Sequence, residues 1–323
     1  MRKVNQMIKD IERKIEEKTL SLKEVEDLLL ETSWLDEPEL IRKLLAYKTL
    51  PQDSLPMAKK TDAEVKAEWK TEKLPDGTLR LASYKGNDTV VIVPEKIGKA
   101  LVTELGSYVF SVNQPRIKKE LKENRAKIKE IRMSDAVREI GIGAFSGCEQ
   151  LEKVALSNSI IMIPDETFAD CKRLKSISIP ESVEQIGRIA FNQCESLEQI
   201  IIPEGVRRFY TTSNVEYWDY IETFGGCINL KKVVLPDSMT EISGYSFVRC
   251  INLTDIKLPP NLVKIEEAAF YGCKKLLSLT IPQSVKQISD NAFGDCKKLT
   301  LHVTADSYAE QYAIKAGIRY VMD

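Results

Sequence analysis

One short motif, repeated seven times, constrains this 323-residue sequence more than any other feature. In each copy, a phenylalanine precedes a cysteine by three positions. The phenylalanines are Phe145, Phe168, Phe191, Phe224, Phe247, Phe270 and Phe293, and the cysteines are Cys148, Cys171, Cys194, Cys227, Cys250, Cys273 and Cys296. Successive copies keep a constant 23-residue period, except for one 33-residue step from Phe191 to Phe224. A fixed period of this kind indicates tandem structural units.

The consensus within each unit predicts how the unit folds. Residues 171–191 show it whole, as C-x-x-L-x-x-I-x-I-P-x-x-V-x-x-I-x-x-x-A-F. The I-x-I-P segment alternates with period two, which is typical of a short strand with one buried face, and proline ends the strand because it has no N–H to donate. The V-x-x-I and A-F positions then turn the chain and return it. Since a single unit cannot bury its own apolar face, we predict an α/β-type repeat solenoid with parallel strands in register.

These residues resemble those of the bacterial BspA-like leucine-rich repeat proteins, whose units carry the pattern L-x-x-I-x-I-P…I-x-x-x-A-F-x-x-C. The resemblance covers about residues 68–323. Residues 74–110 are similar to the family's opening hairpin and first, longer repeat, and residues 305–321 to its closing helix and terminal strand. The resemblance implies an extended binding scaffold, and some members of the family resemble cell-surface adhesins. This sequence departs from the pattern by a helix-like insertion after Phe110 and an aromatic insertion after Phe209.

The chain is expected to have two parts. Residues 1–60 predict a small all-α module, with an amphipathic face at Val4, Ile8, Ile11 and Ile15 and a capping box at Ser21 and Glu24. Two prolines in residues 49–61 indicate a linker. Residues 61–323 predict the leucine-rich repeat solenoid, with an opening hairpin and first repeat over 68–110, tandem repeats over 111–304 and a C-terminal cap over 305–323. The all-α module either caps the solenoid or forms a separate docking or dimerisation module.

Composition narrows the class of protein. Hydrophobic residues make up 43% of the sequence, enough for a large core, and the formal net charge of -1 gives no general attraction to nucleic acid or an acidic membrane. The first segment, MRKVNQMIKDIERKIEEK, lacks the uninterrupted apolar run of a signal peptide. We therefore expect a cytoplasmic protein as the sequence is written, or an extracellular or cell-surface protein if an export signal has been removed.

The seven cysteines are expected to be core residues. Neighbouring cysteines would lie one turn of the solenoid apart, but their number is odd and the sequence has no C-x-x-C pair and a single histidine. A buried free cysteine behaves as a small hydrophobic residue. The phenylalanines are likewise expected to stack through the core. The sequence therefore predicts no metal site and no cofactor.

The outward positions of the predicted strands are the first candidates for a binding surface, because solenoids usually bind through their concave face. These positions are Glu130 and Arg132, Lys153 and Ala155, Ser176 and Ser178, Gln199 and Ile201, Lys232 and Val234, Asp255 and Lys257, Ser278 and Thr280, and Thr300 and His302. Among them we select Lys232, Asp255 and Lys257 as candidate partner contacts. The set lacks paired carboxylates and a Ser–His–Asp arrangement, so no enzyme and no catalytic residue are predicted.

The one long step of the repeat holds an aromatic insertion. Phe209 occupies the register of Ile186, Ile242, Ile265 and Ile288 and is expected to be buried, so the ten additional residues follow it. Tyr210, Tyr217, Trp218 and Tyr220 either pack as a small satellite core or form a binding edge, since tyrosine and tryptophan dominate interface hot spots. An enzyme or ligand-binding protein with its site in residues 210–222 is a further alternative, and it requires a perturbed acid or base near Glu216, Asp219 or Glu222.

Residues 115–132 carry eight basic and three acidic residues and predict a helix with Ile117, Leu121 and Ile128 on one face. The charges would then be solvated, and without interleaved aromatic residues nucleic acid is not an expected partner. The leading hypothesis is a non-enzymatic scaffold that binds a protein partner through the concave face and the insertions. Its rival is a secreted or surface adhesin.

Overall fold

The computed structural model describes residues 9–15, 28, 60–114, 116–210 and 222–323. The chain divides into two compact units, residues 1–64 and 65–323. In the first unit, residues 9–15 are helical and Ile11 is buried. The capping box at Ser21 and the other expected helical segments of residues 16–48 lie outside the described residues, apart from Leu28. Whether residues 1–60 form a cap or a separate module stays a prediction.

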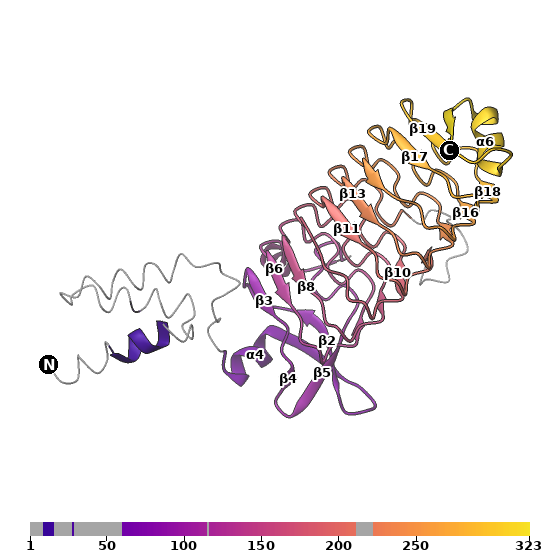
Figure 1. Cartoon of the computed structure of the whole chain (residues 1–323). Helices are drawn as coiled ribbons and strands as arrows, with labels where there is room; N and C mark the ends of the chain where they lie inside the picture. Colours follow the sequence, from indigo (N-terminus) through magenta and orange to yellow (C-terminus); the bar gives the residue numbers. More distant parts are fainter. Residues whose placement is uncertain (1–8, 16–27, 29–59, 115, 211–221) are drawn as a thin grey trace. The chain divides into compact units, whose positions relative to one another are not determined.

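The second unit is a solenoid of parallel strands (Figure 1). From residue 60 onwards the elements are α4 (Asp62–Glu68), β1 (Trp69–Lys73), β2 (Leu79–Tyr84), β3 (Val90–Ile92), β4 (Lys96–Ile97), β5 (Ala100–Leu105), α5 (Lys119–Arg125), β6 (Glu130–Arg132), β7 (Glu139–Ile140), β8 (Lys153–Ala155), β9 (Met162–Ile163), β10 (Gln185–Gly187), β11 (Gln199–Ile201), β12 (Phe209–Tyr210), β13 (Lys232–Val234), β14 (Glu241–Ile242), β15 (Asp255–Ile256), β16 (Lys264–Ile265), β17 (Ser278–Thr280), β18 (Gln287–Ile288), β19 (Thr300–Val303), α6 (Tyr308–Ala316) and β20 (Arg319–Met322).

Most turns of the solenoid contribute two short strands. The I-x-I-P segments and the equivalent segments of the other turns form a first column, which consists of β3, β6, β8, β11, β13, β15, β17 and β19 and ends with the terminal strand β20. The V-x-x-I segments form the second column, which consists of β5, β7, β9, β10, β12, β14, β16 and β18. Figure 1 shows the two columns along opposite sides of the solenoid. The sequence predicted the parallel first column, whereas the second column was expected only as returning chain. Residues 176–179 keep the alternation of exposed and buried side chains without forming a strand.

Residues in the left-handed backbone conformation make the turns around each core phenylalanine. The residue two positions before the phenylalanine has a φ between 40° and 60° in seven turns, at Tyr108, Gly143, Glu166, Ile189, Glu222, Tyr245 and Ala268. The residue two positions after it is also left-handed, at Gly147, Asp170, Gln193, Gly226, Arg249, Gly272 and Asp295. Between them, the phenylalanine N–H donates to a carbonyl of the next turn, as from Phe168 to Ala190 at 2.8 Å. The A-F segment is therefore a pair of tight turns joined to the next unit.

A column of stacked rings fills the core. Phe110 and the seven motif phenylalanines stack one above the next, with centroid distances of 5.1 to 5.5 Å and interplanar angles of 5° to 16°. Trp69 and Tyr84 close the column at its first end, and Tyr312 of α6 meets Phe293 edge-on at the other. Phe209 pairs in register with Ile186 and is 1% exposed, which confirms its expected core position. The rings of Phe191 and Phe224 are 5.2 Å apart, so the long step leaves the spacing of turns unchanged.

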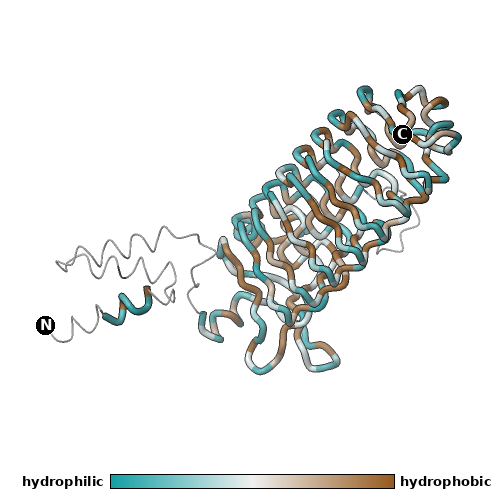
Figure 2. Tube along the Cα trace, in the orientation of Figure 1, coloured by the Kyte–Doolittle hydropathy of each residue, from teal (hydrophilic) through white to brown (hydrophobic). Residues whose placement is uncertain are grey.

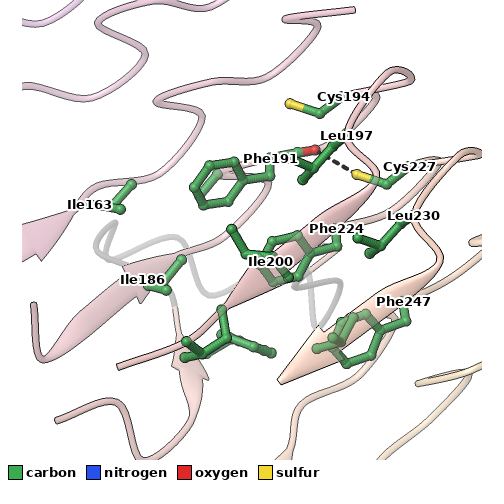
Figure 3. Close-up of a cluster of buried hydrophobic side chains, with 14 of the residues drawn as sticks. Ile163, Ile186, Phe191, Cys194, Leu197, Ile200, Phe224, Cys227, Leu230 and Phe247 are labelled. Atoms are coloured by element: carbon green, nitrogen blue, oxygen red, sulfur yellow. Dashed lines mark hydrogen bonds between the residues drawn. The ribbon is translucent and has the colours of Figure 1, made fainter. Parts of the chain in front are cut away.

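All seven cysteine thiols are free and buried, and each donates a hydrogen bond to the phenylalanine carbonyl of the preceding turn. The S···O distances run from 3.1 to 3.4 Å. Figure 3 shows this contact between Cys227 and Phe191, beside the stacked rings. Burial raises the pKa of Cys148 and Cys227 to about 12, because a thiolate would be desolvated there. The thiols therefore act as neutral donors between turns, in addition to filling space.

The first insertion is held by a buried arginine. The helix α5 is only seven residues long, shorter than the predicted helix, and Arg125 is its one buried residue. The Arg125 guanidinium is 1% exposed and donates to the carbonyls of Tyr84, Tyr108 and Ser111 and to the Ser83 hydroxyl, at 2.6 to 3.3 Å. Ile128 is buried as expected, but in the turn after the helix. The insertion is thus anchored by hydrogen bonds rather than by an apolar helix face.

The two ends of the solenoid differ. At the first end β1 and β2 form an antiparallel hairpin, and β2 pairs in parallel with β5. At the other end α6 buries Ala309, Tyr312 and Ala313, and β20 adds a strand to β19. The Ser307 side chain accepts a hydrogen bond from the Glu310 N–H, and Gly317, with a φ of 65°, ends the helix. These are the closing helix and terminal strand that the resemblance implied.

Candidate interaction surface

The exposed face of the first column is a continuous set of outward side chains. In β8, β11, β13 and β17 the middle residue is buried and the two flanking residues are exposed, as the alternation predicts. Figure 2 shows hydrophilic and hydrophobic residues interspersed along the turns. The strands of the column form three sheets, β3-β6-β8, β11-β13-β15 and β17-β19-β20, and within each sheet the strand pairing fixes the spacing of the outward side chains. The outward positions predicted from the sequence are therefore presented together.

Two aliphatic side chains lie next to each other near the middle of this face. Ile201 of β11 is 60% exposed and Val234 of β13 is 39% exposed, and the strand register places them side by side. The outward residues of the two preceding turns are small, Ala155 and Ser178, and both are exposed. Ile201 and Val234 are among the outward positions predicted from the sequence, but only charged residues were selected from that set as candidate contacts. Two β-branched aliphatic residues at outward positions are the feature of the sequence that indicates an apolar contact here.

The structure brings two of the selected charged residues together. Lys232 of β13 and Asp255 of β15 are register partners, and the Lys232 Nζ is 3.1 Å from an Asp255 carboxylate oxygen. Both side chains remain more than half exposed, at 52% and 62%. Lys257 follows β15 directly and is exposed. The aliphatic pair is thus bordered by a partly neutralised ion pair and a further lysine.

The aromatic insertion is described only at its two ends. Tyr210 belongs to β12, where its backbone pairs with Gly187. Tyr217, Trp218 and Tyr220 lie outside the described residues, as do Glu216 and Asp219. Glu222 is half-buried and accepts a hydrogen bond from the Asn192 side chain at 3.0 Å. The role of these residues as contacts stays a prediction.

A polar hollow of about 450 Å³ lies on the turn edge beside Glu222. It opens where the residues flanking the core phenylalanine are small, at Gly225, Gly226 and Ala268, whereas neighbouring turns carry larger side chains. Tyr245 and Tyr271 contribute to its wall. A second hollow, of about 390 Å³, lies at the first end of the solenoid and includes Arg80, Glu72 and Glu104.

Arg80 is already paired within that second hollow. Its guanidinium is 2.6 Å from the Glu104 carboxylate and 3.5 Å from Glu72. The hydrogen bond to Glu104 raises the pKa of Arg80, because it favours the charged form. Within the described part of the chain, no group of three or more His, Cys, Asp or Glu side chains is arranged to hold a metal ion.

The basic segment 115–132 presents fewer free charges than its composition indicates. The Arg125 guanidinium is buried in the contacts described above. Arg132 pairs with Glu130 at 2.5 Å on the first column. Lys119 and Glu123 form an exposed pair along α5 at 3.8 Å. The exposed pair along α5 agrees with the solvated charges that the sequence predicted, whereas the buried Arg125 does not.

Stacked parallel turns with a phenylalanine column and buried leucines define a tandem-repeat solenoid of the leucine-rich repeat class. A comparison with protein families defines the class more narrowly. Residues 102–214 and 220–313 match the model of the BspA type leucine rich repeat region, in six copies. The match covers more than half of the chain, and the chain therefore belongs to this family.

Solved structures of bacterial leucine-rich repeat proteins are similar to this chain. One is a leucine-rich repeat protein of T. pallidum, with 25% identity, a TM-score of 0.55, and coverage of 68% of this chain and 91% of that one. Another, from Bacteroides ovatus, has 25% identity and a TM-score of 0.48, and the match covers 73% of this chain and 70% of that one. A search of curated proteins finds no match. Among the described residues, no helix has the length and apolar character needed to cross a membrane.

Proposed function

We propose that this chain is a non-enzymatic scaffold that binds another protein through the exposed face of the first column. The observation that carries the proposal is the adjacent pair Ile201 and Val234, two aliphatic side chains exposed side by side on a sheet surface. Protein interfaces combine an apolar centre with a polar rim. Ala155 and Ser178 extend the low, flat centre, and Lys232, Asp255 and Lys257 provide the rim.

The repeat architecture supports the same function. Ile201, Val234, Lys232 and Asp255 stand on strands that are hydrogen-bonded to each other, so this part of the binding surface needs little ordering when a partner arrives. The core beneath uses the remaining strand positions for burial, which leaves the outward positions free to vary. Tyr217, Trp218 and Tyr220 are proposed as additional contacts from the insertion, since aromatic residues are enriched at hot spots.

Ile201→Asp tests the proposal directly, with Ile161→Asp as its matched control. Ile161 is 62% exposed and precedes β9 of the second column, so the two substitutions change the same residue type at similar exposure on opposite sides. We expect partners recovered from a bacterial lysate by the parent chain to be retained by Ile161→Asp. Binding to Ile201→Asp should weaken by about tenfold or more, because a carboxylate is then desolvated in the contact.

Equal recovery with both variants would show that the first column is not the contact surface. A variant lacking residues 210–222 separates the insertion from the column. If it loses partners that Ile201→Asp retains, the insertion and not the column carries the binding. Calorimetric titration of each purified variant with a purified partner then gives the Kd.

A further inference from the structure

The last strand of the first column has an open edge. Among the described strands β20 pairs with β19 alone. All four of its residues are exposed, including Tyr320 at 37%, Val321 at 49% and Met322 at 48%. An exposed apolar edge strand is a template for pairing with another chain. In β20 neither proline, nor a lysine, nor a bulge blocks that edge.

The backbone of β20 presents a defined set of hydrogen-bonding groups at this edge. The Asp323 N–H donates to the Val303 carbonyl of β19 at 3.1 Å. In a parallel pair the N–H and C=O of one residue point to the same neighbour, and successive residues alternate. Arg319, Val321 and Asp323 therefore direct their backbone groups to β19. Tyr320 and Met322 direct theirs to the open edge.

We infer that two copies of this chain associate through β20, with the two strands antiparallel about a two-fold axis at Val321. In this register Tyr320 of one copy faces Met322 of the other. The N–H and C=O groups that these two residues direct to the open edge then form hydrogen bonds between the copies. The same register places Tyr320 and Met322 side chains against each other on the core side of the sheet. Sulfur–aromatic contacts of this kind are favourable. A two-fold interface uses the same patch on both copies and closes at a dimer.

Charge complementarity favours the antiparallel register. It sets Arg319 of each copy opposite Asp323 of the other, on the face that also carries Val321. Within one chain the Asp323 carboxylate is 2.9 Å from the His302 Nδ1 and is 50% exposed, so it can also receive an arginine. The Arg319 guanidinium donates to the Lys298 carbonyl at 2.7 Å through one of its nitrogens, which leaves other N–H groups to donate. A second copy thus supplies both the opposite charge and the missing strand.

Charge reversal tests this register by sedimentation velocity on the full chain over a concentration series. The parent is expected to show a concentration-dependent monomer–dimer equilibrium. Arg319→Asp and Asp323→Arg, made singly, each place like charges opposite each other at two symmetric positions. Each single variant should raise the dimer Kd by about tenfold or more. The double variant restores both opposite-charge pairs and should return the Kd to within about threefold of the parent.

Lys315→Asp provides the matched control. Lys315 forms an exposed ion pair with Asp290 beside the same end of the solenoid, at 2.8 Å, but lies on α6. Its reversal should leave the dimer Kd unchanged, and thermal unfolding of every variant confirms that it folds. A parent that stays monomeric at all concentrations overturns the inference. So does open-ended growth beyond a dimer, or a double variant no tighter than the single ones.

Discussion

At the scale of single residues, the turns depend on left-handed backbone at positions that are often not glycine. Ile189 has a φ of 60°, where a β-branched side chain is an outlier. The equivalent position is Gly143 in one turn and Glu166 in the next. Left-handed backbone costs an L-residue roughly 1–2 kcal/mol. The hydrogen bonds made by Phe191, the core phenylalanine that follows Ile189, hold the conformation in spite of this strain.

Ile189→Asn should stabilise the protein. Asparagine tolerates the left-handed region, so we expect the free energy of unfolding to rise by about 0.5–1 kcal/mol. Urea denaturation measures the change. Ile161→Asn is the control, because Ile161 is exposed and does not have a positive φ. A loss of stability at residue 189, or an equal gain at residue 161, would mean that backbone strain does not limit stability here.

At the scale of elements, α5 shows how a short helix can be fixed without an apolar face. The Arg125 side chain passes into the core and donates hydrogen bonds to the carbonyls of Tyr84, Tyr108 and Ser111. Burial lowers the pKa of Arg125, since it disfavours the charged form, and the hydrogen bonds compensate for the lost hydration. The helix therefore depends on one side chain.

Arg125→Met should destabilise this element strongly. The substitution keeps a long side chain but leaves buried carbonyls without a donor, so the free energy of unfolding should fall by about 3 kcal/mol. Hydrogen exchange should accelerate first in residues 116–128. Lys122→Met on the exposed side of the same helix should change stability by less than about 0.5 kcal/mol. Similar losses for the two variants would contradict the anchoring role.

Much of the solenoid could be predicted from the sequence, because its core residues recur at a fixed spacing. The stacked phenylalanines, the buried thiols and Phe209 follow directly from the register of the repeat. The second column could not be predicted, since two-residue strands such as β14 and β16 are too short to show a period. Arg125 was also missed, because a lysine- and arginine-rich segment indicates a solvated face and a buried arginine depends on carbonyls distant in sequence.

The candidate surface was predicted less completely than the core. Outward positions follow from alternation, and Lys232 and Asp255 are one repeat apart, so their proximity could be expected. The pairing of Ile201 with Val234 spans the long step between Phe191 and Phe224, and the register across that step comes from the structure. The hollow beside Glu222 depends on which turn residues are small, which the consensus does not fix.

At the scale of the whole molecule, the same neutral thiol recurs in seven turns. Burial raises the pKa of every one, to about 11 at Cys296 and about 12 at Cys148 and Cys227, from an ordinary value of 9.0. In the unfolded chain the thiols ionise near that ordinary value. Stabilisation by the protonated thiols is therefore complete below about pH 9 and is lost as the pH rises towards 11–12.

The solenoid should consequently unfold in mild alkali. Each thiol contributes a loss of about 1.4 kcal/mol per pH unit above its unfolded pKa, and the seven contributions add. Denaturation at fixed intervals between pH 7 and pH 10.5 measures the slope. Replacing Cys148, Cys227 and Cys250 by serine should make the slope shallower by nearly half, since serine does not ionise in this range. A stability that is constant up to pH 10 would show that the thiols do not control it.

The direction of the hydrogen bonds between turns has a mechanical consequence. The bonds of both columns join one turn to the next, so they run along the length of the solenoid unit. Tension applied between residue 65 and residue 323 would load the junctions between turns in series. Since every turn contacts only its neighbours, the unit would open one turn at a time at low force, with steps of one repeat in extension.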